Sequence, residues 1–170
     1  MRLSHRLLLT GVPLAAAASA DAQTLDVTVT LPRLSVAEYH KPYVAIWLEG
    51  PDRSTRTLAV WYDVDNPKGE GAKWLADVRQ WWRASGRTLK LPADGLSGAT
   101  RGPGAQRASF GPRQLAGLKP GQYTLLVEAA REVGGREVVR VPVAWPPKPG
   151  QTASAAGKAE LGQITATVRR

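Results

Sequence analysis

The chain has 170 residues, a formal net charge of +9 and no cysteine, which excludes thiol redox chemistry, iron–sulfur ligation and cysteine-linked haem. Its two histidines, His5 and His40, are too few for a multi-histidine metal site, and no G-x-S-x-G motif supports a hydrolase. The lysines and arginines are scattered, which indicates a solvated basic surface or, as the alternative, a surface that meets anionic partners. We expect no nucleic-acid partner.

Residues 1–22 have the pattern of a secretory signal peptide. A basic start is followed by an apolar stretch over residues 7–18 and by the cleavage pattern Ala20-Asp21-Ala22. The alternative is an uncleaved anchor, but the apolar stretch is shorter than the roughly 20 residues that span a bilayer. We therefore expect a cleaved leader, a periplasmic location and one mature β-sandwich domain over residues 23–170.

The first half of the mature chain reads as strands followed by a helix. Residues 24–31 alternate apolar and polar side chains, which is typical of a half-buried strand. Residues 43–49 and 56–62 are rich in aliphatic and aromatic side chains and predict a hairpin around Gly50-Pro51-Asp52. His40 precedes this hairpin in a polar segment, which favours a solvated or capping role over a catalytic one.

Residues 63–71 form a loop with three carboxylates, whose spacing favours a polar turn over a calcium site. Residues 72–85 predict one amphipathic helix capped by Gly86, with a single apolar stripe. The stripe consists of Trp74, Leu75, Val78, Trp81 and Trp82. A brief strand is expected over residues 87–91.

The second half predicts further strands. Residues 121–132 and 136–143 form an expected hairpin, because Gly134-Gly135 suits a turn that needs positive φ. Residues 101–112 are expected to be a loop, residues 145–158 a long loop or an ordered crossover, and residues 159–168 a final strand. The resulting fold class is mainly β, an antiparallel immunoglobulin-like sandwich with one inserted amphipathic helix.

Residues 94–100, Asp-Gly-Leu-Ser-Gly-Ala-Thr, form the most specific motif of the chain. Gly98 and Ala99 are small and would let another molecule approach the hydroxyl of Thr100 closely. Asp94 would fix the loop through an Asx turn. If a phosphate group were attached to the Thr100 hydroxyl, Arg101 or Arg107, or backbone N–H groups of the following glycines Gly102 and Gly104, would neutralise its charge.

This segment resembles the consensus D-G-x-(S/T)-(G/S)-A-T that FAD:protein FMN transferases modify. The matching residues are Asp94, Gly95, Ser97, Gly98, Ala99 and Thr100. The resemblance implies that a separate transferase attaches FMN through a phosphoester to Thr100, and that Asp94 helps the transferase to recognise the segment. The alternative is an ordinary surface turn, which the same residue types would also form.

A wider resemblance covers most of the mature chain. Residues 41–49, 73–75, 81–83, 97–101, 121–123 and 128–132 are similar to a family of predicted periplasmic proteins of unknown function. Members of that family are often associated with a flavin transferase and a PepSY-type membrane reductase. The resemblance implies a non-catalytic electron carrier that works near a membrane surface with a PepSY-type reductase or another redox partner. The alternative is a cofactor-free periplasmic binding or assembly module.

The six tryptophans supply candidates for a flavin contact, since an isoalloxazine ring can stack on indole. Most of them are expected in the core, because tryptophan is highly buried on average. The adjacent Trp81 and Trp82 point about 100° apart on a helix, so they would not both be buried. One of these two is therefore the expected flavin contact.

Overall fold

The computed structural model describes residues 23–148 and 150–169 and contains two sheets. The first sheet includes a strand in which apolar and polar residues alternate strictly. Strand β1 (Thr24–Leu31) buries every second side chain, as its pattern predicts. It pairs antiparallel with β5 (Gly104–Phe110) and with β9 (Gln163–Arg169), and β8 (Thr152–Ala156) pairs with β9 at the edge. The first sheet therefore has the order β5-β1-β9-β8.

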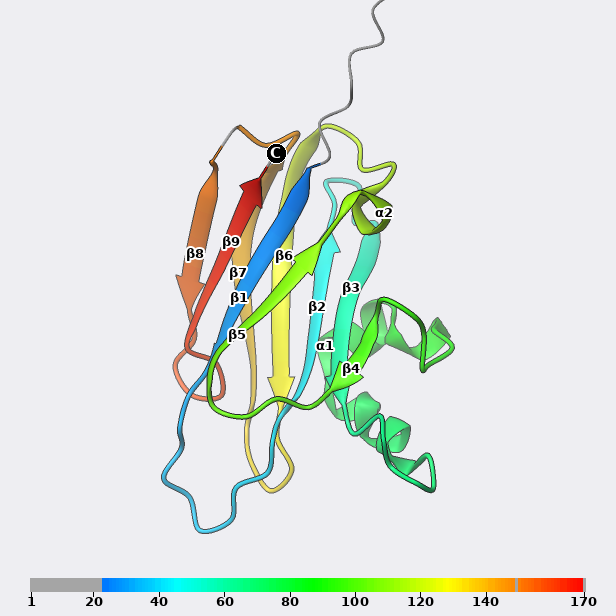
Figure 1. Cartoon of the computed structure of the whole chain (residues 1–170), viewed down its shortest axis with the longest axis vertical. Helices are drawn as coiled ribbons and strands as arrows, with labels where there is room; N and C mark the ends of the chain where they lie inside the picture. Colours follow the sequence, from blue (N-terminus) through cyan, green and yellow to red (C-terminus); the bar gives the residue numbers. More distant parts are fainter. Residues whose placement is uncertain (1–22, 149, 170) are drawn as a thin grey trace, which may run out of the picture.

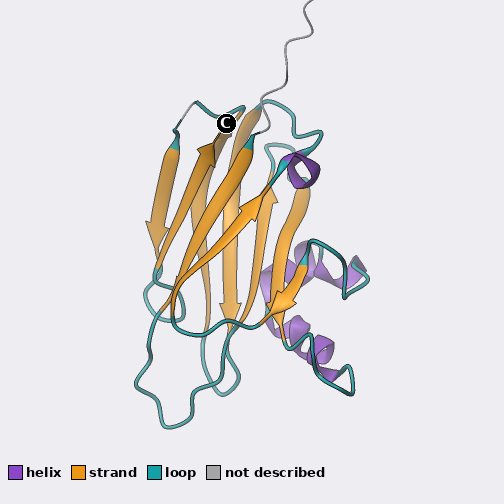
Figure 2. Ribbon diagram, in the orientation of Figure 1, coloured by secondary structure: helices purple, strands orange, loops and turns teal. Residues whose placement is uncertain are grey.

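The second sheet has the order β4-β3-β2-β6-β7 and packs face to face on the first, so the predicted mainly β sandwich is confirmed (Figures 1 and 2). Its strands are β4 (Ser97–Ala99), β3 (Thr55–Tyr62), β2 (Tyr43–Glu49), β6 (Gly121–Ala130) and β7 (Arg136–Trp145). All neighbours in this sheet are antiparallel except β3 and β4, which run parallel. The predicted signal peptide, residues 1–22, lies outside the described residues.

Both faces of the central strands β2 and β3 are covered, which explains their nearly continuous apolar sequences. One face of the second sheet packs on the first sheet in the main core. The other face packs under the segment between β3 and β4 in a second cluster that includes Trp47, Val60 and Leu126 from the sheet, with Leu75 and Trp81 from that segment. This covering segment, residues 63–96, is named the helical insert (Figure 2).

The helical insert is not the single helix expected over residues 72–85. It consists of a 3₁₀ helix η1 (Glu70–Asp77), a short helix α1 (Arg79–Ala84) and a second 3₁₀ turn η2 (Gly86–Thr88). The break lies at the buried Val78, and the carboxylate of Glu128 on β6 accepts hydrogen bonds from the N–H groups of Gln80 and Trp81. A buried carboxylate thus starts a new helix where the periodicity predicts an uninterrupted one.

Two further details of the helical insert correct the prediction. Gly86 does not act as a left-handed cap; a Cβ there would lie 2.7 Å from Cζ3 of Trp81, so glycine is needed for space. Residues 87–91 form no strand, because β4 already occupies the free edge of β3. Leu89 and Leu91 instead pack against the second cluster.

Residues 101–112, expected to be a loop, and residues 145–158, expected to be a long loop or an ordered crossover, each contain a strand. Strand β5 pairs with β1 from Leu25↔Phe110 to Leu31↔Gly104, and a short helix α2 (Pro112–Leu115) follows it. Strand β8 is a run of Thr, Ala and Ser, with Ala153 and Ala155 packed against the main core. These two segments become strands because they pair with strands of the first sheet. Their small or glycine-rich sequences have low β-propensity, so the sequence does not predict them as strands.

The predicted hairpin of β6 and β7 is confirmed, but its glycines act through space instead of through positive φ. The positive φ, 50°, belongs to Val133. A Cβ on Gly134 would lie 2.4 Å from Cζ of Arg131, and one on Gly135 would lie 2.8 Å from Oε1 of Glu160. The turn therefore packs tightly on a buried arginine–glutamate pair.

Candidate functional site

Thr100 lies directly after β4, at the edge of the second sheet. Strand β4 pairs with β3 in the register Val60↔Ser97, Trp61↔Gly98 and Tyr62↔Ala99. The N–H of Thr100 donates to the carbonyl of Tyr62 at 3.1 Å, and its side chain is half-buried. The motif is therefore a turn followed by a paired strand, where the sequence suggests only a loop, and this pairing fixes the backbone of Thr100.

The turn before Thr100 accounts for several residues of the motif. Gly95 has φ +73°, a left-handed conformation that favours glycine. Ser97 Oγ accepts from the N–H of Ala93 at 3.0 Å, and the Ala93 carbonyl accepts from the N–H groups of Leu96 and Ser97. These bonds close the turn in place of the Asx turn expected from Asp94, whose side chain is exposed.

Trp61 supports the other side of the motif. A Cβ on Gly98 would lie 3.3 Å from Cδ1 of Trp61, so a small residue suits this position. The guanidinium of Arg101 lies 3.9 Å from the centroid of the same ring and donates to the carbonyl of Arg107 at 2.8 Å. Burial lowers the pKa of Arg101 from its usual value, although an arginine keeps its charge in proteins. The side chain of Arg101 thus contacts Trp61 and Arg107. Ala99 is exposed.

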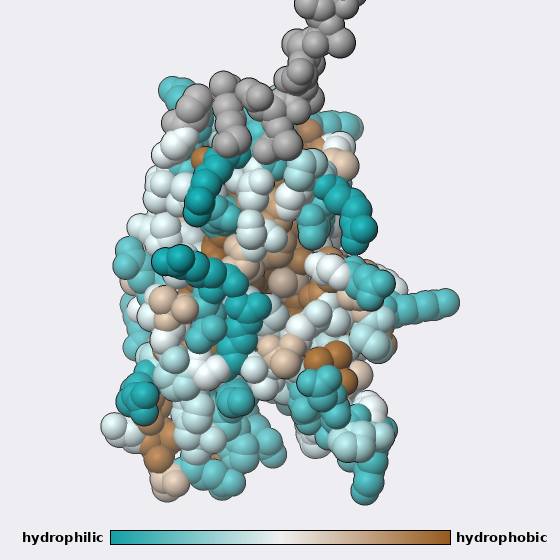
Figure 3. Space-filling model, in the orientation of Figure 1, coloured by the Kyte–Doolittle hydropathy of each residue, from teal (hydrophilic) through white to brown (hydrophobic). Residues whose placement is uncertain are grey.

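Thr100 lines a cavity of about 450 Å³ between the β1–β2 connection and the helical insert. Figure 3 shows the corresponding hollow between two projecting lobes of the molecule. Tyr39, His40 and Lys41 contribute from the β1–β2 connection. The remaining lining residues are Tyr43, Asp63, Asn66, Glu70, Gly71, Trp74 and Glu132.

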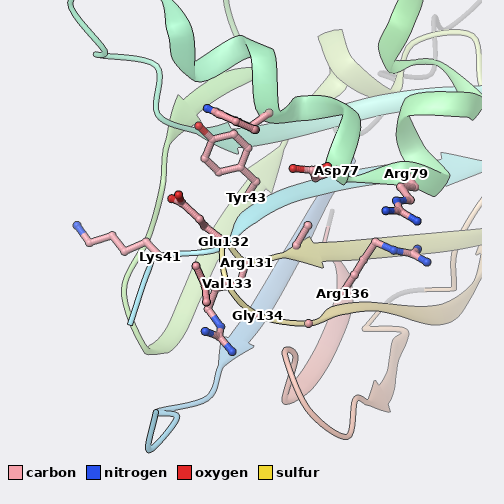
Figure 4. Close-up of a pocket in the computed structure, with 12 residues that line it drawn as sticks. Lys41, Tyr43, Asp77, Arg79, Arg131, Glu132, Val133, Gly134 and Arg136 are labelled. Atoms are coloured by element: carbon pink, nitrogen blue, oxygen red, sulfur yellow. The ribbon is translucent and has the colours of Figure 1, made fainter. Parts of the chain in front are cut away.

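A second cavity of about 490 Å³ continues the first. The two share Lys41, Tyr43, Trp74 and Glu132, and together they are named the groove. In Figure 4, Lys41 lies at one end of the second cavity, and Arg79 and Arg136 lie at the other. The groove thus runs from Thr100 past an exposed indole to an end lined by Arg79 and Arg136 together with Asp77.

Hydrogen bonds and ion pairs hold the walls near Thr100. Tyr43 Oη donates to the carbonyl of Gly71 at 3.1 Å, and burial raises the pKa of Tyr43. His40 Nε2 lies 3.0 Å from Glu38 and its Nδ1 lies 3.5 Å from Glu132, so His40 joins the β1–β2 connection to the β6–β7 turn. His40 thus belongs to the candidate site, although the sequence suggests only a solvated or capping role.

Buried side chains stabilise the β6–β7 turn, which lies at the far end of the groove. Arg131 and Glu160 form a pair with both side chains 6% exposed, through Nε–Oε2 and Nη2–Oε1 contacts of 3.0 Å. Glu160 Oε1 also accepts from the N–H of Gly135 at 2.8 Å. Arg136 Nη1 donates to the fully buried Glu128 at 2.9 Å. These contacts fix the backbone that presents Glu132, Val133 and Arg136 to the groove.

The position of the tryptophans differs from the prediction. Trp81 is fully buried and donates from Nε1 to Thr57 Oγ1, so it cannot reach a ligand in the groove. Trp82 is partly buried against the second cluster. Trp74, expected on the packed stripe, is 62% exposed and lines both cavities. The 3₁₀ helix η1, which ends just before the break at Val78, buries Leu75 and leaves Trp74 exposed.

Asp63 belongs to a polar turn in the 63–71 loop, and the carboxylate of Glu70 pairs with Lys73. Asn66 donates to Asp63 and accepts from the N–H groups of Lys68 and Glu70. Over residues 23–148 and 150–169, no group of three or more histidines and carboxylates is arranged to hold a metal ion. In the same part of the chain, no helix is long and apolar enough to cross a membrane.

Comparison with known proteins identifies one family. A family model described as "Predicted periplasmic protein (DUF2271)" matches residues 24–163, which include the second sheet, the helical insert, the groove and the first sheet except β9. No curated protein and no solved structure matches the chain.

Proposed function

The chain belongs to the DUF2271 family of predicted periplasmic proteins, and on this premise we propose that it is a periplasmic electron carrier with FMN attached covalently to Thr100. The observation that carries the proposal is that the hydroxyl-bearing residue of the motif lines the groove. The other motif residues form the turn and the strand that hold Thr100 there.

The residues around Thr100 suit a flavin phosphoester. Lys41 brings a cationic group to the cavity that contains Thr100, and Tyr43 and Trp74 bring aromatic surface. Three carboxylates also line this cavity, those of Asp63, Glu70 and Glu132. A cavity of several hundred Å³ has the size of a cofactor site, although the lining of this one is mainly polar. Lys41, rather than Arg101 or Arg107, lines this cavity and is the candidate to neutralise the phosphate.

Attachment requires a transferase that supplies FAD, a metal ion and a base. The Thr100 oxygen attacks the phosphorus on the flavin side of the FAD pyrophosphate and loses its proton to the base. The new P–O bond forms as the pyrophosphate bond breaks, and AMP leaves. This chain contributes the positioned hydroxyl and small neighbours at Gly98 and Ala99, while the attached flavin supplies the electron chemistry.

We assign the electron partner to a membrane reductase of the PepSY type. The positive net charge, which the mature chain keeps after loss of residues 1–22, favours approach to an anionic membrane surface, where such a reductase is embedded. The carrier role needs no substrate pocket of its own, so we propose no independent enzymatic activity.

Co-expression with an active FAD:protein FMN transferase tests the proposal. The expected product is yellow after denaturation and carries the mass of an FMN group on the peptide that contains Thr100. Thr100→Val should abolish attachment, and Thr152→Val, which changes an exposed threonine on β8, should leave it intact. A colourless wild-type protein of unmodified mass would favour the cofactor-free binding module instead.

A further inference from the structure

We propose that the groove is the docking site of the isoalloxazine ring, with Trp74 stacked on the ring and Arg79 and Arg136 at its far end. This inference rests on the proposed attachment of FMN to Thr100. It adds the position of the flavin ring and the residues that hold the ring there. It also predicts whether these residues favour the oxidised or the reduced flavin.

The continuity of the two cavities supports this location. Thr100 lines the first cavity, and the second begins at the residues that both share. A flavin tethered at Thr100 through its phosphate and ribityl chain therefore meets the groove directly. The second cavity, about 490 Å³, has the size of a small-molecule site.

Trp74 offers a surface that the fold leaves free. An indole that is 62% exposed on a short 3₁₀ helix gains little from packing, yet it stands at the junction of the two cavities. A planar ring that stacked on it would remove apolar surface from water and gain the geometry that aromatic pairs favour. Trp47 and Trp81 are fully buried and offer no such surface.

The cations at the far end provide an electrostatic role. Arg136 is held by Glu128 while its side chain remains 39% exposed, and Arg79 is exposed beside it (Figure 4). Two-electron reduction of a flavin with uptake of one proton leaves a negative charge on the ring. A guanidinium nearby stabilises that charge and favours the reduced state. Glu128 already pairs with Arg136 and Asp77 lines the same cavity, so Arg79 is expected to contribute most of this effect.

Fluorescence of the covalently loaded protein tests the stacking. Flavin emission should be quenched in the intact protein and recover after proteolysis, because the peptide lacks the groove. Trp74→Ala should lower the ratio of docked to undocked flavin about two- to tenfold, and Trp74→Phe should retain part of the effect. Trp82→Phe, a matched change outside the groove, should have no effect.

A redox titration with dithionite tests the electrostatic role of the far end of the groove. Arg79→Gln should lower the ratio of reduced to oxidised flavin at a fixed potential about two- to fivefold. Arg87→Gln removes the same charge from an exposed position of the helical insert outside the groove and should change the ratio little.

The outcomes separate this inference from the proposed function. If FMN attaches but Trp74→Ala leaves its emission unchanged, the groove is not the ring site and the attachment stands. If FMN does not attach, titration of the unloaded protein with lumiflavin, the ring without its phosphate chain, still tests the groove. Quenching that Trp74→Ala abolishes supports the site, and emission unaffected by the protein overturns it.

Discussion

Two glycines of the motif serve different physical needs at the residue scale. Gly95 has φ +73°, and Gly98 faces the Trp61 ring. Only the first requires a backbone conformation that other residues avoid. The sequence motif alone does not separate these two reasons, because both positions read simply as glycine.

Gly95→Ala should therefore destabilise the protein by about 1 kcal/mol, since the turn must hold an alanine in the left-handed region. Gly102→Ala is the matched control, because a Cβ there meets nothing within 4 Å and the backbone does not have a positive φ. It should be neutral or slightly stabilising. Urea denaturation of the two variants measures both effects; equal stabilities would contradict the strain assigned to Gly95.

The motif residues were identifiable from the sequence, but their surroundings were not. Thr100 lies in the groove with side chains from the β1–β2 connection, the helical insert and the β6–β7 turn. None of these segments carries a motif that would connect it to residue 100. A uniform helical period places Trp74 on the packed stripe, but Trp74 is exposed.

At the scale of elements, a buried carboxylate overrides helical periodicity. Glu128 on β6 binds the N–H groups at the start of α1 and the guanidinium of Arg136. The apolar pattern of the helical insert did predict burial of Leu75, Val78 and Trp81. It did not predict the break, because the residue that causes the break lies about 50 positions away on another element.

The β6–β7 turn depends on the Arg131–Glu160 pair. Glu160→Gln should destabilise the protein by about 3–5 kcal/mol, because it leaves the buried Arg131 charge without its partner. Thermal and urea unfolding measure the change. Glu70→Gln, which breaks the exposed pair with Lys73, is the control and should change stability by less than about 0.5 kcal/mol. Similar losses for both variants would contradict the role given to burial.

Across the whole molecule, Glu137 ties the two sheets together. It lies on β7 of the second sheet, and its carboxylate accepts from the N–H groups of Lys158, Ala159 and Leu161 in the β8–β9 connection of the first. Partial burial alone would raise the pKa of Glu137, but these backbone hydrogen bonds together outweigh burial and lower the pKa below its ordinary 4.5.

A carboxylate whose pKa is lower in the folded state stabilises the fold when the pH is above its unfolded-state pKa. This stabilisation is lost as the pH falls through its folded-state pKa. Glu137→Gln should therefore cost about 1 kcal/mol at pH 7, allowing for partial exposure. The difference from wild type should shrink as the pH falls below about 4.5. Urea unfolding across this range measures it, with Glu49→Gln as the control. A difference that grows on acidification would contradict a lowered pKa for Glu137.

The layered architecture was the most predictable property of the whole molecule. Alternation in β1 indicated one solvated face, and the apolar runs of β2 and β3 matched a sheet covered on both sides. The parallel pairing of β3 with β4 was not predictable, because three residues within a glycine-containing motif carry no periodic signal. That pairing nevertheless determines where Thr100 lies.

The short length of β4 has a consequence for its dynamics. Strand β4 has three residues at a sheet edge, flanked by the Val60 N–H···Leu96 carbonyl and Thr100 N–H···Tyr62 carbonyl bonds. We expect its separation from β3 to cost far less free energy than unfolding of the whole sandwich. The amides of Val60 and Thr100 should therefore exchange with deuterium by local opening. That of Val127, on a strand paired on both sides, should exchange only through global unfolding. Under the proposed attachment of FMN, residues 97–100 would reach the transferase as an extended peptide and return to their place, while the rest of the fold stays closed.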